Sequence, residues 1–215
     1  MSEKNAPPPF LFKRWMNKTP KMIALGGAVF TVLVIVGVWY YASPKNTQIG
    51  YTPKQPIPYS HKLHVDGLGM DCRYCHTGVE TGKNALIPPS QTCMNCHATI
   101  KADSPKLAPL RKSVQDKTPI PWIRVNKIPD HAHFPHQAHV TKGVGCVSCH
   151  GRVDQMEEVR VVSPLSMSWC LECHQNPSGH IRDKNKVTEM TDAPGTLSTT
   201  LLKTPLKTDC SRCHR

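Results

Sequence analysis

The sequence predicts a chain of mostly short helices and irregular loops, packed around prosthetic groups in place of a side-chain core and preceded by one N-terminal transmembrane helix. Three observations predict this fold class. From residue 43 onward, only 32 of 173 residues are Leu, Ile, Val or Phe, a fraction otherwise typical of disordered chains. The same region has 16 prolines, which argue against long helices or wide sheets. All ten cysteines lie in five CxxC pairs, and a histidine follows each pair.

The CxxCH pattern is the attachment signature of a c-type haem. The two cysteines take the haem vinyl groups as thioethers, and the adjacent histidine is held beneath the iron. Five large apolar haems would fill the interior that the side chains leave out, so the sequence predicts a multihaem cytochrome c with five covalently bound haems c. The attachment residues are Cys72, Cys75, Cys93, Cys96, Cys146, Cys149, Cys170, Cys173, Cys210 and Cys213. The predicted proximal iron ligands are His76, His97, His150, His174 and His214.

Zinc is the alternative interpretation, because zinc ribbons also contain CxxC pairs. Zinc sites combine two such pairs, whereas this chain has five, and zinc does not explain a histidine after every second cysteine. No cysteine is left over for a disulfide. The pattern therefore favours haem.

The formal net charge of the chain is +12. Five haems bring about ten propionate carboxylates, so the basic balance is explained by charge compensation for cofactors and lipid. The sequence has no basic patch interleaved with aromatic residues. We expect no nucleic-acid partner.

An uncharged apolar run of 21 residues spans residues 22–42. At about 1.5 Å rise per residue, a helix of this length crosses the hydrocarbon core of a bilayer. Trp39, Tyr40 and Tyr41 close the run, where an aromatic belt is expected. Residues 1–21 are basic, so the positive-inside rule keeps this tail in the cytoplasm and puts the C-terminal part outside.

A cleaved signal peptide is the alternative to a retained anchor. The run is longer than an ordinary signal-peptide core and ends in bulky aromatic residues instead of the small residues of a cleavage site. Both interpretations put the haem region on the outer side of the membrane, where bacteria attach haem c. We expect a single-pass protein of the bacterial inner membrane with a periplasmic haem domain.

Residues 43–59 contain several prolines and predict an extended linker. The pentahaem domain then covers residues 60–215 and contains an internal repeat. The first two-haem module (60–97) and the second (131–174) each begin with an HxxH pair, followed by two CxxCH motifs. The region 175–215 carries the fifth motif, with no histidine pair before it.

The connector between the modules, residues 98–130, is rich in lysine and proline. Its alternating apolar residues from Ile120 to Val125 predict a short strand. Residues 176–208 are polar without a clear period, so we expect them to wrap the surface. Short helices are expected around the CxxCH motifs, and no other long helix.

Each iron needs a distal ligand if every haem is six-coordinate. Histidines at positions i and i+3 of a helical turn share a face but diverge enough to reach different irons, which would hold neighbouring haems close together. The alternative is that the HxxH pairs are surface histidines. Because the two pairs occupy equivalent places in the repeat, we predict four distal ligands: His61, His64, His136 and His139.

The fifth distal ligand has several candidates. They are His131, His133, His180, Met70, Met94, Met156, Met167 and Met190. A third ligand from the short stretch around the second histidine pair would be strained. Met167 lies three residues before Cys170 at a place where the repeat is broken, and a thioether ligand raises the potential of a haem relative to histidine. We predict Met167, and the alternative is that it packs against a porphyrin edge.

Several segments carry a family resemblance: SHKLH and MDCRYCHTGVE, CMNCH, FPHQAH, PLSMSWCLECH and the final CSRCHR. In this order, together with the N-terminal apolar run, they resemble the pentahaem cytochrome c subunit of alternative complex III over nearly the whole chain. Each two-haem module is also similar to the class III cytochrome c pattern. The chain departs from the family at His131 and His133, which leaves open a changed ligand or a local proton acceptor.

The resemblance implies an electron-transfer subunit of a membrane quinol:electron-acceptor oxidoreductase. The implied partners are polytopic quinol-binding membrane subunits, an iron–sulfur subunit, and a monohaem cytochrome c subunit or terminal oxidase. Electrons would pass from quinol through iron–sulfur clusters to these haems. Gly26 and Gly27 would allow close packing of the apolar run against a membrane partner.

The alternative function is a stand-alone, membrane-anchored multihaem quinol dehydrogenase that feeds a periplasmic reductase. Such proteins carry four haems and set the first motif closer to the helix, whereas here 29 residues separate Ala42 from Cys72. The sequence has no Ser/His/Asp triad, paired carboxylates, phosphate loop or identifiable quinol site. The ligand count also leaves little room for an open iron. We therefore expect a subunit that is not an enzyme by itself.

Overall fold

The structure is a computed structural model that describes residues 13–43, 48–191 and 208–214. Three parts of the predicted domain plan lie outside the described residues: 1–12 of the cytoplasmic tail, 44–47 of the linker, and 192–207 with 215 of the fifth-haem region.

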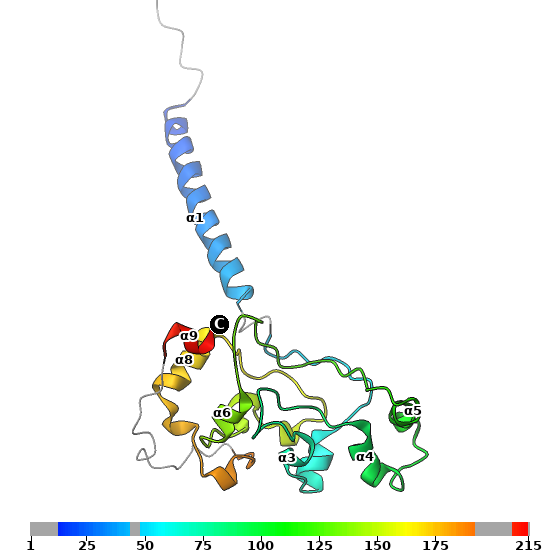
Figure 1. Cartoon of the computed structure of the whole chain (residues 1–215). Helices are drawn as coiled ribbons and strands as arrows, with labels where there is room; N and C mark the ends of the chain where they lie inside the picture. Colours follow the sequence, from blue (N-terminus) through cyan, green and yellow to red (C-terminus); the bar gives the residue numbers. More distant parts are fainter. Residues whose placement is uncertain (1–12, 44–47, 192–207, 215) are drawn as a thin grey trace, which may run out of the picture.

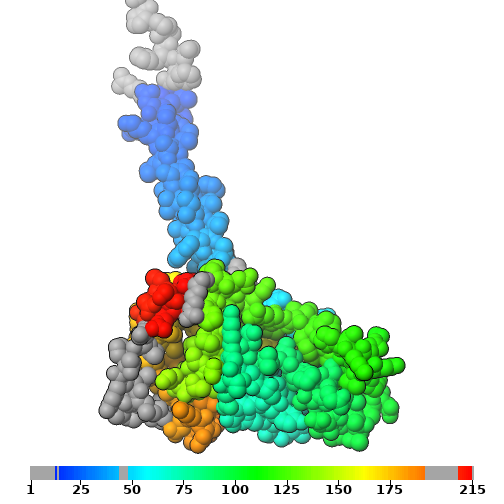
Figure 2. Space-filling model, viewed as in Figure 1, coloured from blue at the N-terminus to red at the C-terminus, as the bar shows by residue number. Residues whose placement is uncertain are grey.

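A single long helix, α1 (Thr19–Tyr41), follows the short 3-10 turn η1 (Arg14–Lys18). Pro20 lies in its first turn, where a missing N–H costs no helical hydrogen bond. None of its residues is buried, and the helix stands clear of the domain (Figures 1 and 2). By length and composition α1 can cross a membrane. One apolar N-terminal helix suggests a membrane anchor, at the place where the sequence predicted one.

The domain consists of short helices joined by irregular loops, as the sequence predicted. Within the described residues the only strand-like pairings are two isolated bridges, Ala132 with His214 and Val144 with Ile181. The α-helices are α3 (Cys72–Cys75), α4 (Ser90–His97), α5 (Ala108–Asp116), α6 (His136–Val140), α7 (Val147–His150), α8 (Met167–Gln175) and α9 (Cys210–Cys213). The other turns are the π-helical η2 (Lys62–Gly67) and the 3-10 turns η3 (Pro105–Leu107), η4 (Val153–Gln155), η5 (Pro177–Gly179) and η6 (Lys184–Lys186).

The connector contains a helix that was not predicted and lacks the strand that was. Leu110 of α5 is 2% exposed, and Ser113 of the same helix lies 2.5 Å from Ser90 of α4, between the two hydroxyl oxygens. This contact packs the connector against the first module. The strand predicted at 120–125 is wrong, because this segment has no regular structure. Its Pro121 has no N–H to donate to a ladder.

The side-chain core is small, in agreement with the low apolar content. The buried apolar residues within the described ranges are Ile57, Leu110, Met156, Val161, Ile181 and Val187. Ile181 and Val187 come from the segment predicted to wrap the surface, and between them Asp183 to Lys186 are exposed. Larger side chains beside the attachment motifs, such as Leu86, Ile87 and Ile100, are more than half exposed.

The second half of the predicted linker is fastened to the domain. The Gly50 N–H donates to the carbonyl of Val161 at 2.8 Å, and the Val161 N–H donates to the carbonyl of Tyr51 at 3.1 Å. The Gln55 side chain bonds the main-chain N–H and C=O of Ile123, each at 2.9 Å. The chain from residue 50 onward therefore follows the surface of the haem domain and does not hang free of it.

Candidate haem-binding site

Each CxxC pair lies on one helical turn. In α3 and α9 the turn is the whole helix, in α4 and α8 it is part of a longer helix, and α7 begins directly after Cys146. Residues three apart share a helix face, so both thiols of a pair can reach one edge of the same macrocycle. All ten cysteines are free thiols.

Histidine rings of the two HxxH pairs lie opposite rings of the attachment motifs. An imidazole nitrogen bonds a first-row metal at about 2 Å, so two imidazoles on opposite sides of one iron have ring centres about 6 Å apart. The separations between ring centres are 6.2 Å for His64 and His97, 6.5 Å for His136 and His150, and 6.2 Å for His139 and His174. These three pairs have the spacing that a shared iron requires.

His61, the fourth predicted distal histidine, neighbours His76. Burial lowers the pKa of His61 to about 4, and His76, His64 and His150 lower it further through their charge. Burial also lowers the pKa of His150 to about 4, with His136 and His76 as further causes. Iron ligation requires the neutral imidazole, and both rings are neutral at pH 7.

Main-chain carbonyls hold most of these rings through Nδ1. A histidine that donates from Nδ1 presents Nε2 to a metal, and the acceptor fixes the ring and raises its basicity. The acceptors are Ser60 for His64 (2.8 Å), Leu86 for His76 (2.7 Å), Ile100 for His97 (2.9 Å), Lys83 for His136 (2.9 Å) and Pro135 for His139 (2.9 Å).

Two rings have a different environment at Nδ1. Nδ1 of His61 is buried without a hydrogen-bond partner among the described residues. Nδ1 of His150 lies 3.2 Å from the side-chain amide nitrogen of Asn126, a connector residue. His61 and His150 therefore differ from the rings whose Nδ1 donates to a main-chain carbonyl.

One aromatic ring backs each HxxH pair. Tyr59 stacks on His64 with ring centres 4.4 Å apart and meets His61 edge-on at 4.8 Å. Phe134 takes the same two positions against the second pair, at 4.3 and 5.0 Å. The repeat in the sequence is thus also a repeat in three dimensions.

The fifth motif is held against the stretch that precedes the second histidine pair. The His133 N–H donates to the carbonyl of Cys213 at 2.6 Å, beside the bridge between Ala132 and His214. Nδ1 of His214 donates to the carbonyl of His131 at 3.2 Å, and the two rings stack with centres 5.6 Å apart. His131 therefore lies on the Nδ1 side of this ring, whereas an iron would take Nε2. Its carbonyl supports His214 as other carbonyls support the other rings.

Met167 is the first residue of α8, and its side chain is 65% exposed. It lies one turn before Cys170, whose pKa is raised by burial and then by the nearby thiol of Cys213. The fifth attachment helix, α9, therefore lies beside this part of α8 (Figure 1). His180 contributes its carbonyl to the N–H of Gly145 at 3.1 Å.

Thiols of different motifs neighbour one another in a fixed order. In each neighbouring pair, one thiol shifts the pKa of the other: Cys75 with Cys93, Cys72 with Cys146, Cys149 with Cys173, and Cys170 with Cys213. Main-chain contacts agree, since the His136 N–H of the second module donates to Lys83 of the first at 3.1 Å. If the motifs are numbered by their order in the sequence, their neighbouring thiols arrange them in a row as second, first, third, fourth and fifth. In Figure 1, α4 and α9 lie toward opposite ends of the domain.

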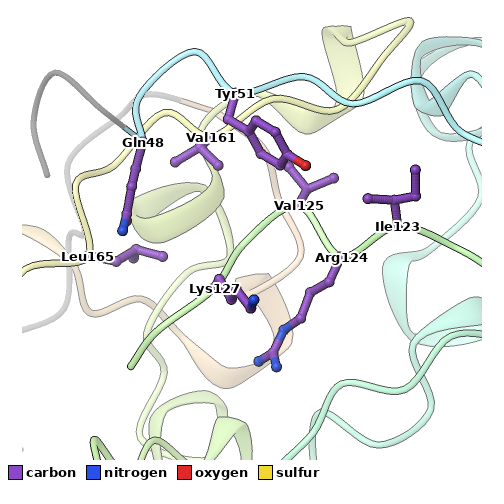
Figure 3. A pocket seen from close by; sticks show the side chains of 8 residues that line it. All are labelled: Gln48, Tyr51, Ile123, Arg124, Val125, Lys127, Val161 and Leu165. Atoms are coloured by element: carbon purple, nitrogen blue, oxygen red, sulfur yellow. The ribbon is translucent and has the colours of Figure 1, made fainter. Parts of the chain in front are cut away.

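A cavity of about 410 Å³ opens beside the connector. Figure 3 shows Tyr51 and Val161 on one side of it and the connector residues Ile123, Arg124 and Lys127 on the other. Arg124 and Lys127 lie on either side of Asn126, the residue that contacts His150. Their positive charges suit the propionate carboxylates of a haem held at the third motif.

The residues present fit c-type haem in three respects. The thiol pairs lie on single turns, imidazole rings face one another at the spacing of two axial ligands, and apolar side chains lie exposed next to the motifs. Residues 132–215 match the sequence model of the family described as cytochrome c7 and related cytochrome c. This region is therefore similar in sequence to cytochrome c7 and related multihaem cytochromes c.

The region similar to cytochrome c7 covers most of the second module and the fifth motif, and a second comparison extends beyond it. The chain is 31% identical over 140 residues to a protein of Nitratidesulfovibrio vulgaris (strain Hildenborough), named as the multihaem cytochrome c subunit of a menaquinone reductase. The match covers 62% of this chain and 64% of that protein. The chain thus spans a little less than two thirds of the length of its curated relative.

The residues that support the rings of the predicted ligands were not predicted from the sequence. Asn126, Lys83 and the carbonyl of His131 are not part of any motif, and two of them act through main-chain atoms. A local signal exists only for the aromatic support, because Tyr59 and Phe134 both lie two residues before an HxxH pair.

Proposed function

We propose that this chain is the electron-transfer subunit of a membrane quinone-linked oxidoreductase and relays electrons along five haems c. The observation that carries the proposal is that thiols of the five attachment motifs neighbour one another in a single order, from α4 to α9. Haem bound at each motif would supply reversible one-electron transfer. The role named for the relative in a menaquinone reductase supports the link to a quinone. The chain itself is proposed to have no catalytic residues.

We assign the iron ligands from the spacing of the rings and from their hydrogen bonds. The proximal ligands are His76, His97, His150, His174 and His214. The distal ligands are His61 opposite His76, His64 opposite His97, His136 opposite His150, and His139 opposite His174. Because carbonyls hold most of these rings at Nδ1, little side-chain movement accompanies a change in the charge of an iron.

Met167 is proposed as the distal ligand of the fifth haem. Its place at the start of α8, next to the neighbouring thiols of Cys170 and Cys213, supports this assignment. In the oxidised protein we expect one sulfur-to-iron charge-transfer band, which Met167→Leu abolishes while the haem count stays at five. Met190→Leu is the control. Five bis-histidine signals in low-temperature EPR of the unaltered protein would rule out this ligand.

The proposed topology follows from α1. The helix anchors the chain in the bacterial inner membrane, with the basic tail in the cytoplasm and the haem domain on the periplasmic side. The proposed partners are polytopic quinol-binding membrane subunits, an iron–sulfur subunit, and a monohaem cytochrome c subunit or terminal oxidase. Membrane lipid surrounds the face of α1 that no partner covers.

Two directions of electron flow are proposed. The resemblance to alternative complex III favours quinol oxidation, with electrons leaving the row toward a cytochrome c or an oxidase. The relative named as a subunit of a menaquinone reductase favours the reverse, in which electrons run along the same row toward the quinone. Both directions use the same motifs and ligands.

The test compares the isolated subunit with the gently solubilised native membrane complex. Each is mixed with a reduced menaquinol analogue, and haem reduction is followed by absorbance. We expect reduction in the complex only, because the chain has no quinol site of its own. Reduction of the isolated subunit at a comparable rate would identify it as a stand-alone quinol dehydrogenase instead. The reverse direction is tested in the complex, by reducing the haems chemically and measuring menaquinol formed.

A further inference from the structure

We propose that Asn126 is the positioning residue for His150 and that its side chain sets the reduction potential of the third haem, in the middle of the row. The inference rests on the haem ligation by His150 proposed above. It concerns a connector residue that lies in no motif.

The partner of His150 is different in kind from those of the other rings. Nδ1 of His150 lies 3.2 Å from the side-chain amide of Asn126, 24 residues earlier in the chain. The ring of His76, the equivalent proximal ligand of the first module, donates instead to the carbonyl of Leu86 at 2.7 Å. A main-chain carbonyl is the same in every sequence, whereas a side chain can be stronger, weaker or absent. Among the four proximal rings with a described partner at Nδ1, His150 is therefore the one whose support depends on residue type.

The amide can accept from the ring when iron is bound. With Nε2 on the iron, Nδ1 of His150 carries a proton and needs an acceptor. An asparagine amide offers an acceptor oxygen on one side and a donor nitrogen on the other, and a half-turn about its last bond exchanges them. We therefore place Oδ1 of Asn126 toward the ring in the haem-bound protein.

The main chain at Asn126 is held in place. Nε of Arg124 donates to the carbonyl of Asn126 at 3.1 Å. The connector is also tied to residue 55, through the two bonds between Gln55 and Ile123. The amide thus approaches the ring from a fixed backbone. Hydrogen bonds are stronger in such half-buried surroundings than in water.

The strength of the acceptor controls the potential. An acceptor at Nδ1 gives the ring more imidazolate character, which makes it a stronger donor and stabilises ferric over ferrous iron. A carboxylate at position 126 would strengthen this effect, and an apolar side chain of the same shape would remove it. The two changes should move one potential in opposite directions.

The experiment uses Asn126→Asp, which is isosteric, and Asn126→Leu in the full-length holoprotein. The matched control is Asn185→Asp, which adds the same charge at an exposed place on η6. Haem content is measured first, by mass and by haem absorbance. Potentiometric titration then resolves the one-electron waves, and EPR at poised potentials follows the ferric signals.

We expect Asn126→Asp to favour the ferric state of one haem about tenfold, a downward shift of about 59 mV for one electron. Asn126→Leu should shift the same wave upward, and the g-values of one ferric signal should change in both variants. Movement in the same direction in both variants, or no movement, would overturn the proposal. A shift in Asn185→Asp as large as that in Asn126→Asp would also overturn it, because that charge lies near the same motif, through the 3.0 Å bond from the Cys146 N–H to the carbonyl of Val187. Loss of one haem from Asn126→Asp would also overturn it, because the residue would then be structural. Five haems without a shift would contradict the effect on the reduction potential and would leave the proposed electron-transfer function untouched.

Discussion

In the two modules, the second histidine of each HxxH pair (the inner histidine) is supported in the same way, whereas the first (the outer histidine) is supported differently. The inner rings, His64 and His139, each donate to the carbonyl four residues earlier, at 2.8 and 2.9 Å. The outer ring His136 donates across the domain to Lys83 of the first module, whereas His61 has no partner at Nδ1 among the described residues. The hydrogen bonds of the inner rings stay within their own segment and are the same in both modules. The bond from His136 to Lys83 crosses between the modules and has no equivalent at His61, so the position of His136 depends on the first module.

The largest effect is expected from interrupting the row in its middle. Replacing both Cys146 and Cys149 by Ser removes the third motif, which lies between the modules, and we expect electrons to reach haems on one side of the gap only. Replacing both Cys93 and Cys96 removes an end of the row, and the other four haems should still be reduced together. The measurement is the fraction of haem reduced by a quinol analogue in the native complex. Equal losses in the two variants would show that the motifs do not lie in the proposed order.

Removing an inner histidine should free one coordination position in either module. We expect His64→Ala and His139→Ala each to convert one low-spin ferric haem to a high-spin one, since each ring faces a proximal ring at 6.2 Å. EPR of the oxidised protein counts the high-spin signal. His133→Ala is the control, because its described contact to Cys213 is made by the main chain. A high-spin signal in the control would contradict the ligand assignment.

The sequence predicted the parts of the site that are local patterns. The five CxxCH motifs, the two HxxH pairs and the short helical turns that carry them all depend on residues within a few positions of one another. The supports of His150 and of the outer ring His136 could not be predicted, because Asn126 meets His150 across 24 residues and Lys83 meets His136 across 53. Helix α5 was missed for a related reason. Its apolar pattern is short, and its stability comes from packing Leu110 and Ser113 against the first module.

The loop after each inner histidine contains a glycine with positive φ, and the two loops differ in their surroundings. Gly69 has φ +68°, and a Cβ added there would meet nothing within 4 Å, whereas Gly143 has φ +85° and a Cβ there would overlap the carbonyl oxygen of Arg182. We expect Gly69→Ala to cost about 1–2 kcal/mol of unfolding free energy from the backbone alone. Gly143→Ala should cost about 1–3 kcal/mol more through overlap. Thermal unfolding followed by circular dichroism compares them, and equal costs would mean that the 182 segment moves freely.

The smallest effects are expected at the aromatic supports. Tyr59→Phe makes the first module resemble the second at this place, so the unfolding temperature should not change. Tyr59→Ala and Phe134→Ala each remove a ring stacked at 4.4 or 4.3 Å, which should cost about 1 kcal/mol beyond the lost burial. The comparison uses the same thermal unfolding measurement. A large loss in Tyr59→Phe would instead assign a role to the hydroxyl group.

The order of the motifs in space has a consequence for biogenesis. If the domain is exported as proposed, the first motif to leave the membrane becomes an inner member of the row, between the second and the third. The row then extends to one side of this motif first, and to the other side only after residue 150 has been exported. The end motif near α8 is joined only when residues 210–214 dock on the stretch 131–133. We therefore expect chains shortened before residue 146 to mature with two adjacent haems and without a third haem to receive their electrons. Haem counting on such truncated chains, followed by their chemical reduction and reoxidation by the native partner, would show whether maturation can proceed in this piecewise manner.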